Sequence, residues 1–448
     1  MKTIKTYENQ NVIILGLAKS GLAASKLLHR LGANVTVTDR TEPEEEVKRE
    51  LEKEGISSVF GEHPLSLLDN AYMVVKNPGI PYRIPFLQEA LKREIPVITE
   101  VELSYELSEA PIIGITGSNG KTTTTTLIYE ILAAAQKEPL IAGNIGTVSC
   151  EVGAKAEKDQ VIVTELSSFQ LMGIREYKPK IAVLLNIFDA HLDYHSSKEE
   201  YVEAKFNLFS HQDEEDYAVI NADDPVVSAN LGSIKSKVVP FSRHKELKEG
   251  AYLSGNKLMF QEEEIISWDD VLLKGEHNIE NVLAAIATCK LYGASTEAIV
   301  SVLKTFTGVK HRMQYVTNIQ GRAFYNDSKA TNILATKAAL SGFKENVILL
   351  AGGLDRGNGF EDLEDALSCV KALVTFGETA PKLEESAKNV GIQTIKRVDN
   401  VEKAVAAAYK LSEEGDVILL SPACASWDQF KTFEERGDMF INCVHKLK

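Results

Sequence analysis

Short apolar runs recur along almost the whole chain and alternate with longer amphipathic stretches. The runs are NVIILG, ANVTVTD, AYMVVKN, PVITE, PIIGITG, VIVTEL, IAVLLNI, YAVINAD, NVILLAGG, ALVTFG and DVILLSPA. Runs of this length bounded by turns are typical of buried strands, and their alternation with helical stretches is typical of mainly parallel sheets. The pattern therefore predicts an α/β fold.

Two glycine-rich turns between a strand and a helix, at residues 16–21 and 114–122, each open a new α/β unit. The 448 residues suffice for several domains of ordinary size. Residues 211–275 are polar and interrupted, which indicates a small additional sheet. We predict three domains: an N-terminal Rossmann-like domain (1–106), a central domain with a P-loop ATPase-type parallel sheet and the small additional sheet (107–308), and a C-terminal Rossmann-like domain (309–448).

The chain is acidic, with 49 Lys and Arg against 64 Asp and Glu and a net charge of −15. This charge argues against binding to nucleic acid or to an anionic membrane surface. No apolar run approaches the length of a membrane span or of a signal peptide, and the five cysteines form no C-x-x-C pair. We therefore expect a cytoplasmic protein with reduced thiols, no nucleic-acid partner and no membrane insertion, and we expect it to be a monomer.

The strongest local motif is PIIGITGSNGKTTTTTLIYEILAAA. An apolar strand enters a turn containing Gly117 and Gly120, and Lys121 and Thr122 begin a helix. Backbone N–H groups of such a turn bind phosphate oxygens, the lysine offsets their charge, and the hydroxyl after it is placed to bind Mg²⁺. Ile115 stands where the general P-loop pattern has its first glycine. No D-x-x-G or N-K-x-D motif is present, which favours ATP over GTP.

Two later strands end in polar residues that are candidates for a metal site. The first ends at Glu165, and the second leads to Asp189, His191, Asp193 and His195. Ligands of parallel sheets bind beyond the carboxyl ends of the strands, so Glu165 and His191 lie near Thr122 if both strands flank the strand before the phosphate loop. The alternative is that they are ordinary polar residues of strand ends. Lys205 shares a helix face with apolar residues, which by itself indicates only a solvated lysine.

The first glycine-rich turn, GLAKSG, is a weaker motif. It is similar to a dinucleotide-binding turn, but Ala18 replaces the second glycine, and Asp39 ends the next strand. Two nucleotide sites on one chain fit either an ATP-driven enzyme with a nucleotide-linked substrate or an oxidoreductase with a regulatory ATPase.

The motifs together resemble the Mur ligases, ATP-dependent amide ligases that build the peptide stem of bacterial cell-wall precursors. The resemblance spans essentially the whole chain. It rests on GITGSNGKTTTTTL, GNIG, TELSSFQL, LNIFDAHLDYH, NADDP, GEHNIENVLAA, KHRMQYV, YNDSKATN and LLSPACASWDQF in this order. The start of the first domain and the ending SPACASWDQFKTFEERG resemble the members that add D-glutamate to UDP-N-acetylmuramoyl-L-alanine through an acyl phosphate.

Three alternatives remain beside this resemblance. Folylpolyglutamate synthetase shares the architecture, but we do not expect it to carry a domain like residues 1–100 or the SPACAS segment. A sister ligase would add a different amino acid. A non-catalytic nucleotide-binding module would bind ATP without releasing phosphate.

The resemblance implies roles for individual residues in ATP and metal binding. Lys121, His191 and Lys205 would be catalytic. Mg²⁺, as two ions, would be bound by Thr122, Glu165, His191 and Lys205, the last as a carbamate. ATP would be bound by Gly117, Ser118, Asn119, Gly120, Lys121, Thr122, Thr123, Asn278, Arg312 and Asp327.

The resemblance also implies contacts to the two other substrates. The UDP-sugar would contact Leu17, Ala18, Asp39, Arg40, Gly79, Asn144 and His191. D-Glutamate would contact Lys329, Thr331, Ser426, Trp427 and Phe433, with Arg356 as a further candidate. Trp427 stands where the family resemblance leads us to expect a smaller apolar side chain.

Overall fold

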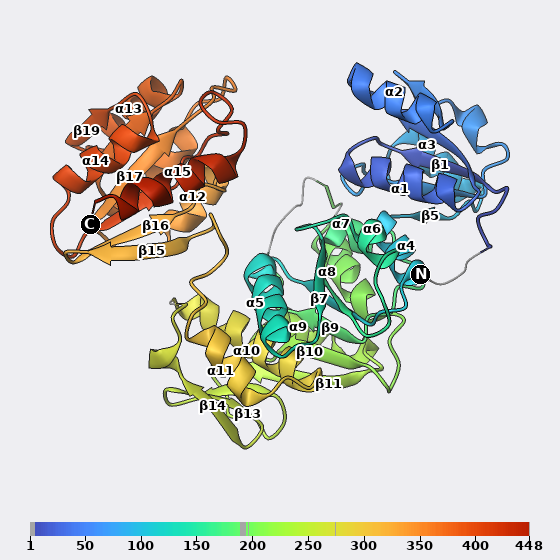
Figure 1. Ribbon diagram of the computed structural model, residues 1–448, viewed down its shortest axis with the longest axis horizontal. Coiled ribbons are helices and arrows are strands. Elements are labelled where there is room, and N and C mark those ends of the chain that lie inside the picture. Colours follow the sequence, from blue (N-terminus) through green and yellow to red (C-terminus); the bar gives the residue numbers. More distant parts are fainter. Residues whose placement is uncertain (1–4, 189–193, 196, 274, 448) are drawn as a thin grey trace. The chain divides into compact units, whose positions relative to one another are not determined.

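The computed structural model describes residues 5–188, 194–195, 197–273 and 275–447. They form two compact units, Met1–Thr305 and Phe306–Lys448, which we describe separately (Figure 1). The first unit contains a five-stranded and a nine-stranded sheet, and the second unit contains a six-stranded sheet. The α/β class predicted from the sequence is therefore confirmed, and each of the apolar runs contributes a strand.

The first sheet is parallel throughout, in the order β3-β2-β1-β4-β5. Alternate side chains of β1 point to opposite faces. Val12 and Ile14 pack in the cluster that includes α1, whereas Ile13 and Leu15 pack on the other face with Phe86 of α3. The strands are Asn11–Leu15 (β1), Asn34–Asp39 (β2), Ser57–Phe60 (β3), Met73–Lys76 (β4) and Val97–Ile98 (β5), and the helices are Lys19–Arg30 (α1), Glu45–Lys53 (α2) and Pro85–Lys92 (α3).

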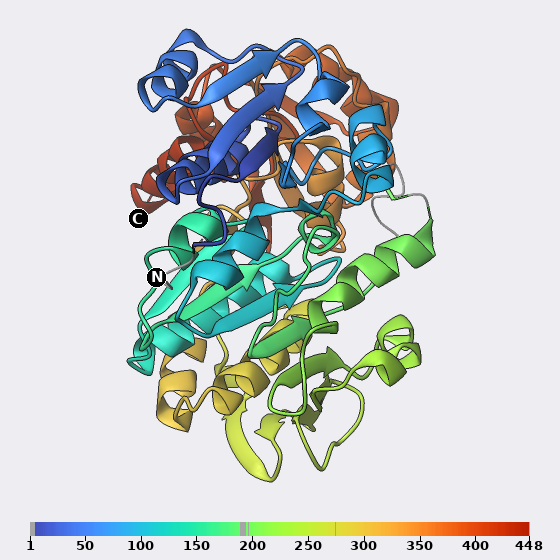
Figure 2. The same ribbon diagram turned by 90° about the vertical axis from the view of Figure 1, so that its right-hand side faces the viewer.

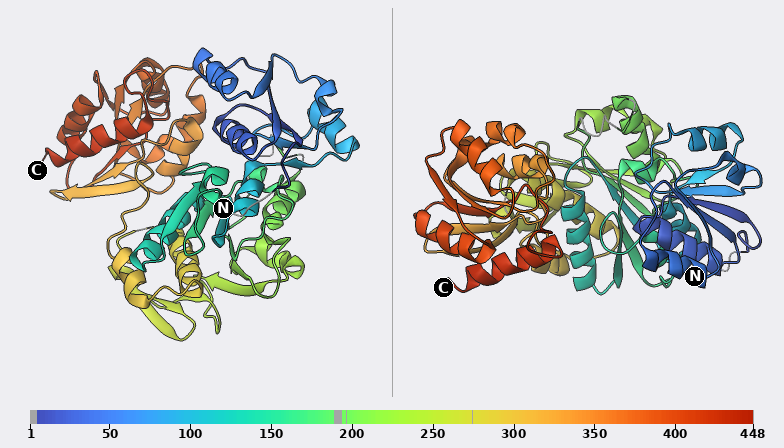
Figure 3. Two further views of the ribbon diagram at one scale, coloured as in Figure 1. Left: turned by 45° about the vertical axis from the view of Figure 1, so that its right-hand side comes forward. Right: turned by 90° about the horizontal axis from the view of Figure 1, so that it is seen from above.

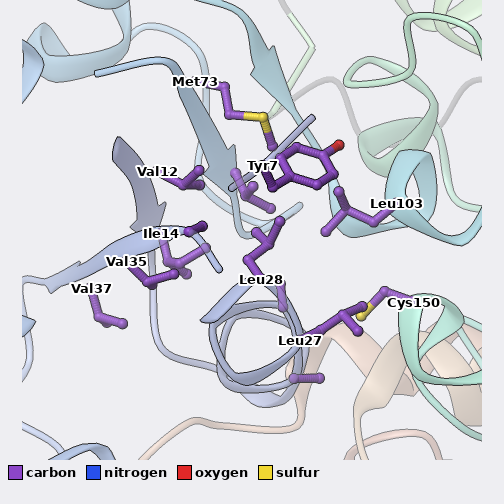
Figure 4. Packing of buried hydrophobic residues seen from close by; sticks show 14 of the residues in the cluster. Tyr7, Val12, Ile14, Leu27, Leu28, Val35, Val37, Met73, Leu103 and Cys150 are labelled. Carbon is purple, nitrogen blue, oxygen red and sulfur yellow. The ribbon is translucent and has the colours of Figure 1, made fainter. Parts of the chain in front are cut away.

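The core of this sheet includes side chains from later in the chain. Helices α4 (Glu100–Leu107) and α6 (Ser149–Gly153) contribute Leu103 and Cys150, which share one apolar cluster with Val12 and Leu28 (Figure 4). Helix α4 also packs directly on α6. The first sheet and these two helices are thus held together by common apolar packing.

The second sheet has the order β14-β13-β12-β11-β10-β9-β6-β8-β7 (Figure 2). Strand β6 lies between β8 and β9 and is parallel to both, as expected if Glu165 is to reach the phosphate loop. The strands are Ile112–Thr116 (β6), Pro139–Gly143 (β7), Val161–Glu165 (β8), Ile181–Leu184 (β9), Tyr217–Asn221 (β10), Lys237–Ser242 (β11), Ala251–Ser254 (β12), Lys257–Phe260 (β13) and Glu263–Ser267 (β14).

Strands β12, β13 and β14 pair antiparallel with one another and extend one edge of this sheet, so the small additional sheet predicted within residues 211–275 is continuous with the central one. On the sheet, α5 packs against β7 and β8, and α10 against β10 and β11. The helices are Lys121–Ala134 (α5), Ser168–Leu171 (α7), Lys198–Phe206 (α8), Pro225–Ala229 (α9), Glu276–Leu291 (α10) and Thr296–Leu303 (α11).

The second unit has a sheet in the order β15-β16-β20-β17-β18-β19. All of its pairs are parallel except β15 with β16. Apolar clusters lie on both faces, beneath helices on either side (Figure 3). The elements are Gln314–Ile319 (β15), Arg322–Asn326 (β16), Ile333–Leu340 (α12), Val347–Gly352 (β17), Val370–Phe376 (β18), Ala380–Asn389 (α13), Thr394–Arg397 (β19), Val401–Leu411 (α14), Val417–Leu420 (β20) and Phe433–His445 (α15).

None of the helices in the described ranges combines the length and the apolar character that a bilayer-crossing segment needs.

Candidate functional site

The turn between β6 and α5 has the geometry of a phosphate-binding loop. Gly120 has a φ of +82°, and a Cβ atom there would lie 2.1 Å from the Asn281 side-chain oxygen. Asn186 supports the loop from β9, because its backbone carbonyl accepts the Ser118 N–H at 2.9 Å and its side-chain oxygen accepts the Asn119 N–H at 2.8 Å. The loop therefore favours glycine at position 120, where Asn281 lies close, and is held by hydrogen bonds to Asn186.

Lys121 folds back over this loop. Its Nζ donates to the backbone carbonyl oxygens of Gly117 at 2.8 Å and Ser118 at 2.9 Å. Lys121 also follows directly on the turn, at the N-terminus of α5, where the helix dipole favours anions. The arrangement concentrates positive charge where a phosphate group would meet the loop.

The Lys205 side chain, which comes from α8, also reaches the phosphate loop. The side chain is 1% exposed, and Nζ donates to the Gly117 carbonyl at 2.8 Å and approaches the Thr116 hydroxyl at 3.4 Å. Burial, and then the nearby charge of Lys121, lower the pKa of Lys205 well below its ordinary value. The interpretation as a solvated lysine is therefore wrong, because the amine points inward to the loop and not to water.

Glu165 ends β8 beside Ile115 of the loop strand. One carboxylate oxygen accepts a 2.8 Å hydrogen bond from the Asn144 side chain, and the other is buried without a hydrogen-bond partner among the described residues. A buried carboxylate oxygen with no donor is suited to a hard cation. Thr122, buried at the start of α5, offers a hydroxyl near the same edge of the sheet.

Other predicted metal ligands cannot be placed. His191, Asp189 and Asp193 lie outside the described residues. Within the described ranges, no group of three or more His, Cys, Asp or Glu side chains could by itself hold a metal ion. Among the described residues, the predicted metal ligands are Glu165, Thr122 and Lys205; Lys205 contacts the phosphate loop, and Glu165 ends the strand beside it.

A cleft of about 510 Å³ brings several predicted residues together. It is lined from the first sheet by Ala18 and Gly79, and from the second by Lys121, Asn144 and Lys205. This volume is in the usual range for small-molecule sites. The further lining residues are Lys19, Ser20, Asn77, Pro78, Glu100, Gly143, Val148, Ser167, Ser168, Phe169, Gln170 and Tyr201.

The first glycine-rich turn is supported by Asp39, at the end of β2. Asp39 accepts the Leu17 N–H at 2.6 Å and the Thr41 N–H at 2.8 Å, so its carboxylate holds the turn in shape. Ala18 has a φ of −72°, which explains why this position does not need glycine. Among the described residues, Leu17, Asp39 and the exposed Arg40 are not part of the cleft lining.

Three residues near the phosphate loop were not singled out from the sequence. Besides Asn186, they are Tyr201, whose hydroxyl lies 2.9 Å from the Ser118 hydroxyl, and Asn281, which donates to the Asn278 side chain at 3.0 Å. Asn278 itself is buried on α10 beside α5. For Asn186 the sequence signal was only a polar residue at the end of an apolar run, and the charged segment around Tyr201 carries no such signal.

In the second unit, most of the predicted residues follow β16, β17 or β20, which are neighbours in the sheet, whereas Arg312 precedes β15. Asp327 is buried, accepts the Ser421 hydroxyl at 2.9 Å and the Met313 N–H at 3.2 Å, and burial raises its pKa to about 7. Arg312 lies close enough to oppose that shift.

Among the residues predicted to contact D-glutamate, two pairs lie close together in this unit. Lys329 Nζ lies 5.8 Å from the centre of the Phe433 ring, and the Arg356 guanidinium lies 5.0 Å from that of Trp427. Trp427 is 63% exposed. Ser426 beside it is buried, and its hydroxyl has no hydrogen-bond partner among the described residues. Thr331 donates its N–H to the Lys329 carbonyl.

Comparison with known families assigns this architecture. The Mur ligase MurD-like N-terminal domain matches residues 10–99, the Mur ligase middle domain residues 115–289, and the Mur ligase glutamate ligase domain residues 311–424. The chain belongs to the Mur ligase family. It is 60% identical over 452 residues to a UDP-N-acetylmuramoylalanine–D-glutamate ligase of Geobacillus sp. strain WCH70, and 58% identical over 449 residues to one of Bacillus thuringiensis strain Al Hakam, with 100% of each chain covered.

Solved structures share the fold of this Mur ligase at low sequence identity. The UDP-N-acetylmuramate-alanine ligase MurC of Thermotoga maritima matches with a TM-score of 0.57 at 19% identity, covering 98% of this chain and 100% of that one. The MurF of Acinetobacter baumannii matches with a TM-score of 0.58 at 16% identity, covering 98% and 92%. The MurF of Thermotoga maritima in complex with ADP matches with a TM-score of 0.54 at 17% identity, covering 100% and 97%.

Proposed function

We propose that this Mur ligase joins D-glutamate to UDP-N-acetylmuramoyl-L-alanine in an ATP-dependent reaction. The observation that carries the proposal is the cleft, in which the turns of the first sheet face Lys121, Asn144 and Lys205 of the second. A nucleotide-linked acid held there has its reacting end at the phosphate loop. The full-length identity to D-glutamate ligases supports the choice of substrates over those of sister ligases.

The reaction proceeds in two steps. The L-alanine carboxylate attacks the γ-phosphate of ATP, which gives an acyl phosphate and ADP. The main barrier is repulsion between two anions, and Lys121 offsets it once its Nζ turns from the loop carbonyls to the phosphates. The D-glutamate amine then attacks the acyl carbonyl, and the tetrahedral intermediate expels phosphate. Asn144 orients the alanine end of the acid substrate, and Gly117, Ser118, Asn119, Gly120 and Thr123 bind the ATP phosphates.

Thr122, Glu165 and His191 would hold Mg²⁺, and Lys205 would join them as a carbamate. Bound Mg²⁺ neutralises charge on the ATP and acyl oxygens during transfer. Burial, and then the charge of Lys121, lower the pKa of Lys205 and so favour its neutral amine, which is the nucleophile toward CO₂. The nitrogen forms an N–C bond as one C–O π bond of CO₂ opens, a proton leaves the nitrogen, and the neutral amine becomes an anionic carbamate. The donor-free oxygen of Glu165 is the observation that supports this set.

We also propose roles in the second unit and for Asn278. Asn278, Arg312 and Asp327 contribute to ATP binding, and Lys329, Thr331, Ser426, Trp427 and Phe433 bind D-glutamate, with Arg356 beside Trp427. Leu17, Ala18, Asp39, Arg40 and Gly79 form the UDP-binding turns. We propose that the protein acts as a cytoplasmic monomer.

An ADP-release assay tests the function. ADP formation should require both UDP-N-acetylmuramoyl-L-alanine and D-glutamate, and Lys121→Ala should abolish it while the circular dichroism spectrum stays unchanged. Release with L-lysine or meso-diaminopimelate but not with D-glutamate would assign a sister ligase. Nucleotide binding without phosphate release for any acceptor would identify a non-catalytic module.

A further inference from the structure

Lys76, the last residue of β4, is a buried lysine that the proposed reaction does not use. Its side chain is 1% exposed. Nζ donates to the Pro78 carbonyl at 3.2 Å and to the Tyr194 hydroxyl at 3.3 Å, and it lies 4.8 Å from the centre of the Tyr82 ring. No carboxylate among the described residues pairs with it, and burial lowers its pKa to about 7. An apolar side chain would fill this position at a lower desolvation cost, so the polar contacts need an explanation.

Those contacts lead to the wall of the cleft. The turn after β4 presents Asn77, Pro78 and Gly79 to the cleft. The turn is already shaped from within, because the Asn77 side chain accepts the Gly79 N–H at 3.0 Å and donates to the Ser20 hydroxyl at 3.2 Å. Lys76 supports the same turn from the buried side, through the carbonyl of Pro78.

Tyr194 connects this turn to the opposite wall. Its hydroxyl lies 2.9 Å from the Pro78 and Ile80 carbonyl oxygens, so it can donate to one of them while accepting from Lys76. Its ring packs on Phe169 with centroids 4.2 Å apart, and Phe169 lines the cleft. Two walls that come from different sheets are therefore joined through the Lys76 amine and the Tyr194 phenol.

We propose that Lys76 is a positioning residue for the sugar nucleotide, which fixes the 77–79 turn against Tyr194 before the substrate enters the cleft. This inference rests on the proposed function, because it concerns the binding of the same substrate. Without the Lys76 amine, the Pro78 carbonyl loses its buried donor, and the turn must be ordered by the substrate itself. Substrate binding then carries the ordering cost, and the chemical step is unaffected.

Lys76→Met tests the proposal, since methionine keeps the unbranched stem and removes the donor. We expect the dissociation constant for UDP-N-acetylmuramoyl-L-alanine, measured calorimetrically without ATP, to rise about tenfold, and KM for this substrate to rise in parallel. The kcat and the KM values for ATP and D-glutamate should stay within about twofold. Lys26→Met, which removes a surface ion pair with Glu50 in the same domain, is the matched control.

Tyr194→Phe provides a second variant that keeps the ring packing. It should weaken sugar-nucleotide binding in the same direction, and the double variant should be no weaker than Lys76→Met alone, because the two groups act as one network. Tyr72→Phe, at an exposed tyrosine, is its control. A folded Lys76→Met protein with an unchanged dissociation constant overturns the proposal. If Lys76→Met does not fold, unchanged binding by Tyr194→Phe overturns it. Failure of the unaltered protein to bind the sugar nucleotide would instead refute the proposed function.

Discussion

Glu100 is a buried carboxyl group at the start of α4, and its protonation should tune the stability of the first unit. It is 2% exposed and accepts the Cys150 N–H at 2.9 Å, yet burial raises its pKa to about 7. Because the folded pKa exceeds the unfolded one, the stabilisation by the neutral form is complete below about pH 4.5 and is lost as the pH rises through about 7.

Glu100→Gln should therefore stabilise the protein more at alkaline than at acidic pH. Glutamine keeps an oxygen for the Cys150 N–H and carries no charge to bury. Relative to the unaltered chain, we expect the free energy of unfolding of the variant to increase by about 2 to 3 kcal/mol between about pH 5 and pH 8. Urea unfolding at both pH values measures this, with Glu157→Gln on the exposed surface as the control. An equal effect at both pH values would contradict the argument.

The proposed role of Lys205 in metal binding depends on conversion of its buried amine to a carbamate. Lys205→Ala should lower kcat roughly 100-fold or more if a carbamate at this position contributes to metal binding. Added bicarbonate should not restore activity, whereas a short carboxylic acid that enters the vacated space should restore part of it. Lys198→Ala, at an exposed lysine of the same helix, should behave like the unaltered enzyme. Full activity of Lys205→Ala would remove the carbamate proposal.

At the scale of elements, the turn before α5 has no room for a side chain at Gly120. Gly120→Ala places a methyl group 2.1 Å from the Asn281 side-chain oxygen in a left-handed backbone conformation. We expect ATP binding, measured by titration calorimetry, to fall below detection. Gly391→Ala is the matched control, because its φ of +83° is nearly the same but no atom lies within 4 Å of the new Cβ. Left-handed alanine costs only about 1 to 2 kcal/mol, so Gly391→Ala should bind ATP normally. Normal binding by Gly120→Ala would contradict the assigned loop.

Burial separates the strands that were predicted from the sequence from the strands that were missed. The central strands read as continuous apolar runs because both of their faces are covered, as Ile112–Thr116 and Val347–Gly352 are. Strands β3, β7 and β19, each at one edge of its sheet, were not predicted. Ser57–Phe60 and Thr394–Arg397 are partly or fully exposed, so selection for apolar residues is weak there and no pattern marks them.

Site residues were predictable where a chemical motif fixes their spacing, and not where the fold alone brings them together. Lys121 and Thr122 follow from their motif, and Glu165 from its place at a strand end. The hydrogen bond from Thr124 of α5 to Asn281 joins residues far apart in the sequence, and the inward orientation of Lys205 depends on how α8 packs. Such contacts depend on tertiary packing that no local pattern records.

At the scale of the whole molecule, the apolar clusters predict which pieces fold alone. Both clusters of the second unit consist of residues within 306–448. The main cluster of the first sheet instead needs Leu103 and Leu107 of α4 and Val148 and Cys150 of α6. A fragment of residues 1–100 would expose that face of the sheet to water, at roughly 25 cal/mol for each Å² left uncovered.

We therefore expect residues 306–448, expressed alone, to unfold cooperatively in urea with a sharp near-ultraviolet circular dichroism signal. Residues 1–100 should lack that signal, bind a hydrophobic dye and aggregate, although they contain a complete five-stranded parallel sheet. The reason is that Leu27 and Leu28 of α1 pack partly against residues supplied by α4 and α6. Cooperative unfolding of the 1–100 fragment would show that the first sheet holds its core without those helices, and aggregation of the 306–448 fragment would show that the second unit does not.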